Sequence, residues 1–430
     1  MKSPRLSRLA NDIHGSAILQ IAADVRALKA QGEQIIDLTV GDFSSKQFRI
    51  PKELEDGIVD ALRAGESTYP PSNGIEALRN AVREFYARRL KLHFPIESIL
   101  ILAGARPAIY ATYRALVDPG DRVVFATPSW NNDSYCDLVG ATPVIVECDA
   151  PTGFLPTADM LRPVIRDARL LALNSPLNPT GTVFDADQLA AICDLVLEEN
   201  ARRGPNERPL YVMYDQVYWM ITAGGVTHVD PVTLRPAMAP YVIFVDAISK
   251  AFAATGLRVG WAIGPADVIK PMADITTHVG AWAPRAEQVA TARLLADHAS
   301  VDRYVDNMRR EAGARLDAVH DGLTAMQRDG FPVECIRPQG AIYVSGRFAL
   351  HGMRTPNGDV LETDDDVRRY ILRAANLAAV PFGAFGVQHD RGGWFRLSIG
   401  VVSVAQIEAV FPPLRHALEM LVGNEVVARG

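Results

Sequence analysis

Hydrophobic positions in the middle of the chain form short, nearly unbroken runs, and segments with helical periodicity separate several of them. The apolar runs fall at 99–102, 123–126, 144–146, 170–173, 210–213, 242–245 and 259–263. Helical patterns lie at 106–117, 130–139, 157–166 and 185–203. Strands that are apolar on both faces and alternate with helices are typical of a mostly parallel sheet with helices on both sides. The pattern therefore predicts a seven-stranded α/β unit.

The pattern differs on both sides of this unit. Residues 16–31 have apolar positions at helical spacing, a short strand is expected at 34–38, and a helix is expected at 75–90. After residue 285 the pattern predicts a smaller α+β domain on which the N-terminal helix packs. Its expected elements are a long helix at 286–328 that could break near 299–300, strands at 332–336, 341–345, 377–381 and 394–399, and a helix at 404–421.

These patterns divide the chain into two predicted domains. We expect a large domain over residues 46–285. The small domain would be discontinuous and would consist of residues 1–45 and 286–430. Within it, the polar stretch 351–366 predicts a surface loop.

Composition narrows the classes of function. The net charge of −6 gives no sign of a nucleic-acid-binding surface, and no apolar run is long enough to cross a bilayer. The first residues, from Met1 to Leu6, contain no apolar signal core, so we expect a cytoplasmic protein. The four cysteines and nine histidines have no metal-ligand spacing, and no metal is expected.

The most informative stretch runs from Ser249 to Gly260 and reads Ser-Lys-Ala-Phe-Ala-Ala-Thr-Gly-Leu-Arg-Val-Gly. Lys250 follows a predicted strand, at the edge where open α/β sheets bind ligands. A lysine amine that is held next to a carbonyl compound and kept partly unprotonated can form a Schiff base. Ser249 and Arg258 are suited to binding a phosphate, so the stretch describes a site for pyridoxal phosphate. A Ser-Lys pair is usually a solvated surface feature, and this segment alone leaves the two interpretations about even.

Two other predicted strand ends carry complementary groups. Asn178 lies in Asn-Ser-Pro-Leu-Asn-Pro-Thr-Gly, a loop that its prolines and glycine make stiff. Asp215 ends another strand, and Tyr218 follows it. A buried carboxylate is costly unless it meets a cation, and a protonated pyridine nitrogen is such a cation. Acidic residues are common at strand ends, so Asp215 is informative only together with the other segments.

With these motifs in this order, the chain resembles a class I, fold type I aminotransferase of the aspartate aminotransferase superfamily over nearly its whole length. The resemblance implies the fold of pyridoxal phosphate-dependent transferases, with pyridoxal 5′-phosphate bound to Lys250. Lys250 would then move the substrate proton, and Asp215 would keep the ring nitrogen protonated. Tyr218 and Asn178 would hydrogen-bond the phenolic oxygen and stabilise its anion.

The resemblance also implies the residues that hold the cofactor phosphate. Ser249 and Arg258 would contact it directly. Gly104, Ala105 and Arg106 open a helix directly after a strand, and backbone N–H groups at that helix start would meet the phosphate as well.

Further residues follow from the same resemblance. Tyr69 would reach the phosphate of a neighbouring subunit, which implies a homodimer with shared active sites. Trp130 would stack on the pyridine ring, although packing in the core is a real alternative for a tryptophan. Arg396 would bind the substrate α-carboxylate through a bidentate pair, with Gly41 and Asn178 beside it.

Some positions depart from the family pattern or stay open. Gln216 stands where relatives commonly have an acidic residue, and the stretch 278–285 is bulkier than expected. Arg106 could meet the distal carboxylate of aspartate or glutamate, or it could bind phosphate or face solvent. Trp282 could line a pocket for an aromatic side chain. The stretch 338–343 resembles a conserved strand entry of the family and reads as structural.

The implied reaction is a ping-pong transfer of an amino group from an amino acid to a 2-oxo acid. A pyridoxal phosphate-dependent lyase or cyclase of the same fold, such as a C–S lyase or an enzyme similar to aminocyclopropane-carboxylate synthase, would use the same residues. A transcription regulator on this fold would need a DNA-binding domain, which the single helix at 16–31 does not supply. The preferred amino donor, the oxo acid and the pathway do not follow from the sequence.

Overall fold

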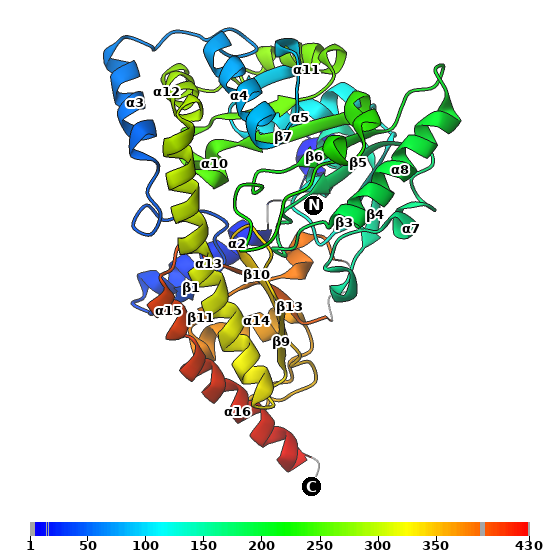
Figure 1. Cartoon of the computed structure of the whole chain (residues 1–430). Coiled ribbons are helices and arrows are strands. Elements are labelled where there is room, and N and C mark those ends of the chain that lie inside the picture. The colour runs from blue at the N-terminus through cyan, green and yellow to red at the C-terminus, as the bar shows by residue number, and fades with distance from the viewer. Residues whose placement is uncertain (1–4, 14, 16, 388–391, 429–430) are drawn as a thin grey trace.

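The computed structural model describes residues 5–13, 15, 17–387 and 392–428. A large sheet unit lies at one end and a smaller unit at the other, and a long helix connects them (Figure 1). The residues from Met1 to Pro4, on which part of the expected location rests, lie outside the described residues, as does Ser16 at the expected start of the first helix.

The large unit contains a seven-stranded sheet with the order β2-β8-β7-β6-β5-β3-β4. Strand β8 is antiparallel to both of its neighbours, and the other adjacent pairs are parallel. This confirms the predicted mostly parallel α/β sheet. Its strands are β2 Ile99–Leu102, β3 Arg122–Thr127, β4 Thr142–Glu147, β5 Ala168–Asn174, β6 Tyr211–Asp215, β7 Val242–Ala247 and β8 Gly260–Ile263.

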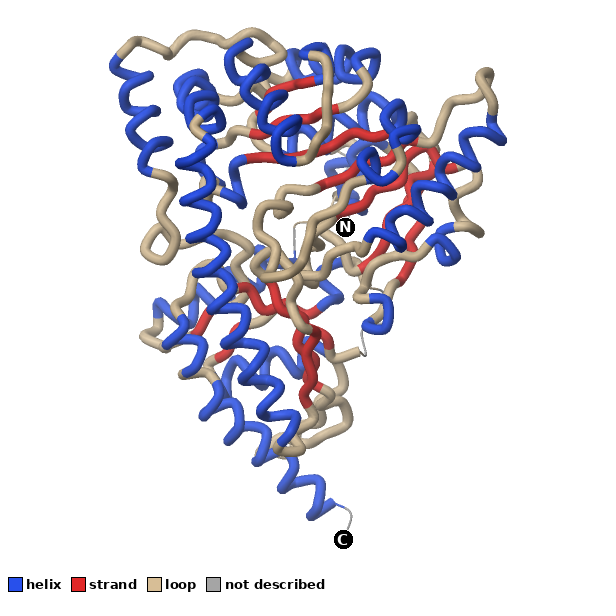
Figure 2. Tube along the Cα trace, in the orientation of Figure 1, coloured by secondary structure: helices blue, strands red, loops and turns tan. Residues whose placement is uncertain are grey.

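Helices cover both faces of this sheet because successive strand residues point to opposite sides. Val124 and Leu171 join one apolar cluster with residues of α4, α8 and α12, whereas Val123 and Leu170 join another with α5, α6 and α11. Blue helices surround the red strands of the large unit in Figure 2. The helices of this unit are α3 Lys52–Arg63, α4 Glu76–Arg89, α5 Ala105–Leu116, α6 Asn132–Val139, α7 Ala158–Leu161, α8 Ala186–Arg203, α9 Pro231–Leu234, α10 Ile248–Ala251, α11 Ala266–His278 and α12 Arg285–Ala296. The short 3-10 turns of the chain are η1 Ile96–Ser98, η2 Ala150–Thr152, η3 Pro236–Tyr241, η4 Thr255–Leu257 and η5 Phe382–Phe385.

The smaller unit is built on an antiparallel sheet with the order β12-β13-β10-β9, and β1 pairs with β11 in parallel beside it. In the N-terminal part, Val25 of α2 shares an apolar cluster with Leu372 of α14. The domain boundaries given above stay a prediction. The strands are β1 Ile36–Asp37, β9 Val333–Ile336, β10 Tyr343–Phe348, β11 Leu377–Ala378, β12 Val380–Pro381 and β13 Trp394–Ser398, and the helices are α1 Arg8–Asp12, α2 Ala17–Ala30, α13 His298–Arg328, α14 Asp364–Ala375, α15 Val404–Glu408 and α16 Phe411–Ala428.

Helix α13 joins the two units, because its N-terminal residues Val301 and Val305 pack in the large core and its later residues, from Met308 to Met326, pack in the small one. It starts after Asp297, whose side chain accepts a hydrogen bond from the Ser300 backbone N–H. The expected long helix is therefore broken at Asp297, near the expected position at residues 299–300.

Several helix predictions were incomplete. The pattern gave no helix for α3, α11 or α14, and it gave a helix at 157–166 where the structure has only α7. The end of the predicted loop 351–366 belongs to α14, whose Thr363 and Asp366 form a reciprocal capping box. The closing helix is divided into α15 and α16.

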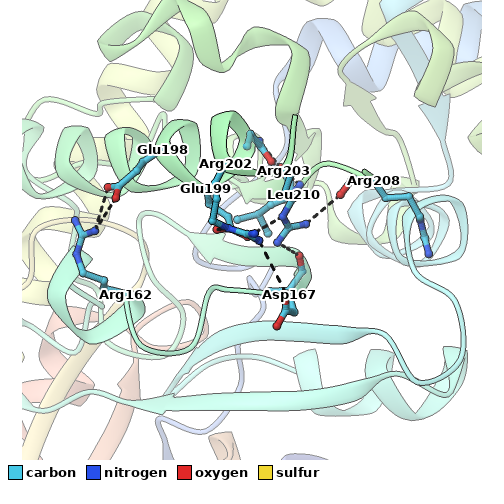
Figure 3. A network of polar contacts seen from close by, with 10 residues as sticks. Arg162, Asp167, Glu198, Glu199, Arg202, Arg203, Arg208 and Leu210 are labelled. Carbon is cyan, nitrogen blue, oxygen red and sulfur yellow. Dashed lines mark hydrogen bonds and ion pairs between the residues drawn. The ribbon is translucent and has the colours of Figure 1, made fainter. Parts of the chain in front are cut away.

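Ionic contacts fix α8 against the sheet, at the end opposite to the strand ends discussed below (Figure 3). The buried carboxylate of Glu199 accepts hydrogen bonds from Arg202 and Arg203, each at 2.8 Å. Arg203 also donates to the Ala168 carbonyl at the start of β5, at 2.7 Å. The two guanidinium groups hold the pKa of Glu199 down at about 2. These contacts tie the C-terminal end of α8 to the start of β5.

Candidate active site

Lys250 lies in the short helix α10, directly after the strand β7. Its Nζ donates a hydrogen bond to the Gly41 carbonyl at 2.7 Å and lies 5.7 Å from the centre of the Tyr218 ring. Burial, together with the positive charges of Arg396 and Arg106, lowers the pKa of Lys250 to about 8, although Asp42 and Asp215 act in the opposite direction. The structure thus holds a lysine whose amine is partly neutral near neutral pH.

Arg396 lies in β13, and its side chain is 1% exposed. Its Nη2 donates to the Thr39 carbonyl at 2.6 Å, and its Nη1 donates to the Asn178 Oδ1 at 3.1 Å. Within the described part of the chain, no carboxylate pairs with this guanidinium, and its Nε has no hydrogen-bond partner. A buried charge without a counter-ion is costly, so the position suits an incoming carboxylate.

Gly41 lies against the same guanidinium. A Cβ atom at this position would lie 2.9 Å from the Tyr343 hydroxyl and 3.4 Å from the Arg396 Nη1. A residue with a side chain would therefore crowd the space beside Arg396, and glycine leaves that space open.

Asp215 ends β6, one strand away from Lys250 in the sheet. Its Oδ1 accepts a hydrogen bond from the Val217 backbone N–H at 3.2 Å. Burial raises the pKa of Asp215 to about 6, although that hydrogen bond and the charge of Lys250 act in the opposite direction. A cation placed against this carboxylate would remove the cost of burying its charge.

Tyr218 lies in the turn after β6 and is buried. Its hydroxyl lies 2.5 Å from the hydroxyl of Tyr343. Burial, the largest influence, raises the pKa of the Tyr218 hydroxyl well above its usual range, so this group keeps its proton and can donate it in a hydrogen bond.

Arg258 packs against the N-terminus of α5. Arg258 donates to the carbonyls of Thr255 and Ala103, at 2.7 and 2.9 Å. A Cβ atom at Gly104 would lie only 2.5 Å from the Arg258 Nη2, and Gly104 also has a positive φ of 93°. Only glycine suits this position, and it leaves the N-terminus of α5 open beside a guanidinium, which is a good anion site. Ser249 is buried next to Lys250 in α10.

Arg106, in the first turn of α5, is exposed, and its guanidinium carbon lies 4.4 Å from the centre of the Trp130 ring. The two residues form a cation–π pair, which places Trp130 at the rim rather than deep in the core. Because Arg106 lowers the pKa of both Lys250 and Arg258, its charge lies close to the same group of residues.

Tyr69 is the predicted site residue that lies apart. It is 82% exposed, and its ring packs edge to face on Trp282 with centroids 5.1 Å apart. Arg285 in turn pairs with Glu66, which anchors the start of the segment that carries Tyr69. No contact links Tyr69 to Lys250 within the described chain, so Tyr69 is presented on the surface.

The sequence patterns missed two residues at the site. Tyr343 was interpreted as structural, yet its hydroxyl faces both Tyr218 and Gly41. Asp42 accepts a hydrogen bond from the Thr255 hydroxyl at 2.6 Å, and its charge raises the pKa of Lys250. A polar residue beside a predicted ligand-binding glycine was the available signal for Asp42, whereas a tyrosine in an apolar strand gave none.

The departure at Gln216 has a structural reason. Gln216 donates to the Tyr86 hydroxyl at 3.2 Å, and Tyr86 in turn donates to the buried carboxylate of Asp246 at 2.7 Å. Trp219 also donates to Asp246, at 2.8 Å. A second carboxylate at position 216 would place two buried acids around one hydroxyl, so an amide fits better.

A surface pocket of about 460 Å³ lies elsewhere, lined by residues such as Lys91, His93, Thr233 and Pro265. It contains none of the predicted site residues. Most of the predicted site residues lie instead at the strand ends around Lys250.

We expect replacement of Lys250 by methionine to stabilise the cofactor-free protein. The pKa of Lys250 is lowered from 10.5 to about 8, so below pH 8 the folded protein carries a charge that burial disfavours. Between pH 8 and 10.5 the unfolded chain binds more protons than the folded one, and this cost disappears as pH rises. We expect the methionine variant to gain about 2 kcal/mol in the free energy of unfolding at pH 7. This is less than the whole pKa shift corresponds to, because Lys250 is partly exposed and donates a hydrogen bond to Gly41.

Urea unfolding of both proteins at pH 7 and pH 10.5 measures this difference. The gain should be present at pH 7 and nearly absent at pH 10.5. A methionine variant that is less stable than the wild type at pH 7 would show that Lys250 carries no unfavourable charge.

Known proteins are similar to this chain over most of its length. The family model described as aminotransferase class I and II matches residues 33–411. The aspartate aminotransferase of Rhizobium meliloti (strain 1021) is 32% identical over 412 residues, which cover 94% of each chain. A probable aspartate/prephenate aminotransferase of Rhizobium leguminosarum bv. phaseoli is 30% identical, with 89% of this chain and 91% of the relative covered.

Solved structures have the same fold. The aspartate aminotransferase from Rhizobium meliloti has a TM-score of 0.87 at 29% identity, covering 97% of this chain and 100% of the other. The aspartate aminotransferase of Thermus thermophilus with maleate has a TM-score of 0.83 at 28% identity, with the same coverage. The aromatic aminotransferase of Pyrococcus horikoshii has a TM-score of 0.80 at 26% identity and covers 92% of this chain and 98% of its own. In the part of the chain that the structure describes, no helix is long and apolar enough to cross a membrane.

Proposed function

The chain belongs to the class I and II aminotransferases, and we propose that it uses pyridoxal 5′-phosphate to move an amino group between an amino acid and a 2-oxo acid. The relatives cited above are named aminotransferases, which supports transfer over the elimination that a lyase or cyclase of this fold would perform.

One observation carries the proposal: a half-buried amine, a half-buried acid and a buried guanidinium converge from three distant segments. The charges of Asp215 and Arg396 both act on the pKa of Lys250, and each of the three groups lacks a partner that a cofactor or substrate would supply. Lys250 is a partly neutral amine, Asp215 is a carboxyl that needs a cation, and Arg396 needs a carboxylate.

The residues present also fit the phosphate of this cofactor. The Arg258 guanidinium packs against Gly104 at the N-terminus of α5, so closely that a Cβ atom at Gly104 would clash with it. Arg258, Ser249 and the backbone of Gly104, Ala105 and Arg106 are the groups that would hold a phosphate there.

When bound, pyridoxal phosphate supplies a carbonyl carbon that an amine can attack and a ring that accepts electrons. Lys250 is placed to bond to that carbon. When its amine is free, the Lys250 Nζ would act first as the base that takes the proton from the substrate Cα and then as the acid that returns a proton. A pKa of about 8 keeps a useful fraction of the amine neutral for this work.

The other residues fix charges around the reacting atoms. Asp215 would face the ring nitrogen and keep it protonated. Tyr218 and Asn178 would donate hydrogen bonds to the phenolic oxygen. Arg396, next to Gly41 and Asn178, would hold the substrate α-carboxylate, and Trp130 would pack on the ring face.

Tyr69 supports a homodimer with shared sites. It is exposed, anchored by Trp282, and separated from Lys250 of its own chain. We propose that it reaches the phosphate bound by a second copy. Sedimentation analysis of the purified protein should give twice the mass of one chain, and a monomer with full activity would contradict this. The cytoplasmic location stays an expectation.

A spectral screen tests the proposed activity. Purified protein loaded with pyridoxal phosphate is mixed with each amino acid in turn, and the visible absorption band and the released 2-oxo acid are followed. A substrate should remove the band and release one oxo acid per site, and a second oxo acid should restore the band. Continuous release of ammonia without restoration would indicate elimination instead.

We expect Arg106 to select dicarboxylic substrates, because its exposed guanidinium lies at the rim beside Trp130. Replacing Arg106 with glutamine removes one charged hydrogen bond and should lower kcat/KM for aspartate by about 10- to 100-fold, with little change for an aromatic amino acid. Steady-state kinetics with both substrates measures the difference.

Arg114→Gln is the matched control, since Arg114 is an exposed arginine of the same helix α5. An equal loss for both substrates in the Arg106 variant would mean that Arg106 serves the cofactor, and no loss would mean that it only faces solvent.

A further inference from the structure

Tyr343 connects the two units of the fold at the site. It is the first residue of β10 in the smaller unit, whereas Tyr218 follows β6 in the large one. The two hydroxyl oxygens are 2.5 Å apart, and the rings pack edge to face with centroids 5.6 Å apart. Both side chains are buried, with exposures of 0% and 2%. Water therefore competes little for this contact, and the two hydroxyls share one hydrogen bond in a fixed geometry.

Tyr343 also contacts Arg396. The guanidinium carbon of Arg396 lies 4.8 Å from the centre of the Tyr343 ring, in a cation–π contact. On its other side, the Tyr343 hydroxyl faces Gly41, where a Cβ atom would approach it to 2.9 Å. One side chain thus touches the proposed carboxylate site and the proposed phenol donor at once.

The direction of the hydrogen bond between the two tyrosines matters chemically. If Tyr343 donates to Tyr218, the Tyr218 proton is free to be donated elsewhere, and if Tyr218 donates to Tyr343, it is not. Burial raises the pKa of Tyr343, Arg396 and the Tyr218 hydrogen bond lower it, and Asp42 and Asp215 raise it. The charge of Arg396 lowers the pKa of Tyr218 as well, but Arg396 lies directly against the Tyr343 ring, and this contact favours Tyr343 as the donor. A carboxylate that neutralises Arg396 weakens this effect.

We propose that Tyr343 is a positioning residue that couples Arg396 to the Tyr218 hydroxyl, so that the arrival of a carboxylate at Arg396 changes how strongly Tyr218 donates its proton. The coupling rests on the proposed function, in which Tyr218 donates to the cofactor. It runs in parallel with the hydrogen bond from Arg396 to Asn178. Loss of the Tyr343 hydroxyl should therefore remove part of the coupling between the carboxylate site at Arg396 and the Tyr218 hydroxyl. The part that passes through Asn178 should remain.

The test follows the visible absorption band of the protein loaded with pyridoxal phosphate during a pH titration, with and without saturating maleate, a dicarboxylate that has no amine to transfer. In the wild type, maleate should raise the pH midpoint of the band. In Tyr343→Phe, the midpoint without maleate should be higher by about 0.5 to 1 pH unit, a shift that corresponds to the free energy of one hydrogen bond. The shift caused by maleate should fall to less than half of its wild-type size.

Two variants separate this role from general loosening of the structure. Tyr370→Phe removes another hydroxyl of the smaller unit, which donates to the Ala417 carbonyl at 2.6 Å, and should leave both the midpoint and the maleate shift unchanged. In a Tyr218→Phe background, adding Tyr343→Phe should produce no further change, because the coupling passes through Tyr218.

The outcomes are distinguishable. A Tyr343→Phe protein with the wild-type midpoint and the wild-type maleate shift would overturn the coupling, and so would additive effects in the double variant. Failure of the wild type to develop a visible band with pyridoxal phosphate would instead overturn the proposed function itself.

Discussion

Replacing Lys250 with alanine is expected to lower the rate of amino transfer by at least about 10⁴-fold. This side chain would act both as the nucleophile that bonds to the cofactor and as the base that moves the substrate proton, and each role alone accounts for a large acceleration. The phosphate-holding groups around Arg258 do not depend on it, so the variant should still bind pyridoxal phosphate without a covalent bond. Steady-state assays and equilibrium dialysis measure the two properties.

The control for this substitution is another lysine. Lys270→Ala removes a side chain that is 80% exposed and pairs with Asp274 on the surface, and it should keep wild-type turnover. Lys250→Arg would retain the positive charge without a usable nucleophile and should be as inactive as the alanine variant. Turnover close to that of the wild type in Lys250→Ala would remove Lys250 from the reaction.

Replacing Asp215 with asparagine is expected to lower kcat by about 10²- to 10⁴-fold, the range for breaking a buried charge pair. Asparagine has nearly the same shape, so the loss would come from the missing negative charge that keeps the ring nitrogen protonated. A matched control is Asp230→Asn. Asp230 is also buried, and it caps α9 through its side chain, a role that asparagine performs equally well.

The pH dependence of cofactor association gives a second readout for Asp215. Burial raises the pKa of Asp215 to about 6, so its carboxyl is mostly charged above pH 6 and mostly neutral below it. Association of the wild type with pyridoxal phosphate should therefore weaken as pH falls through about 6, whereas the asparagine variant should lack this dependence. Stopped-flow association between pH 5 and pH 8 measures it. An asparagine variant with the wild-type pH profile and kcat would contradict the assigned role.

The strands of the large sheet were predictable because they are buried on both faces. A continuous apolar run can be recognised as a strand without knowing which strands pair with it, and all seven runs are strands of the observed sheet. Helices with mixed signals were missed. Helix α11 contains Pro271, which usually argues against a helix interior, and α14 begins with three aspartates that resemble a solvated loop. The three acids favour a helix N-terminus, where the helix dipole stabilises negative charge.

The chemistry of the site was predictable from motifs, but its contacts were not. The spacing within Ser249–Gly260 indicates what Lys250 and Arg258 could do, and the position of Lys250 after a strand indicates the edge on which they lie. That Lys250 donates to Gly41, or that Arg396 donates to Asn178, depends on the smaller unit closing against the sheet. Tyr343 was missed for the same reason, since only that closure places its hydroxyl beside Tyr218.

The central claim is that Lys250 is the amine that bonds to pyridoxal phosphate, and chemical trapping tests it most directly. Borohydride reduction of the loaded protein fixes the bond between the amine and the cofactor carbon, and mass spectrometry of the digested protein locates it. We expect one modified residue per chain, at Lys250, with Lys52 and Lys270 unmodified although their side chains are 81% and 80% exposed. Modification spread over the exposed lysines, with Lys250 untouched, would contradict the account.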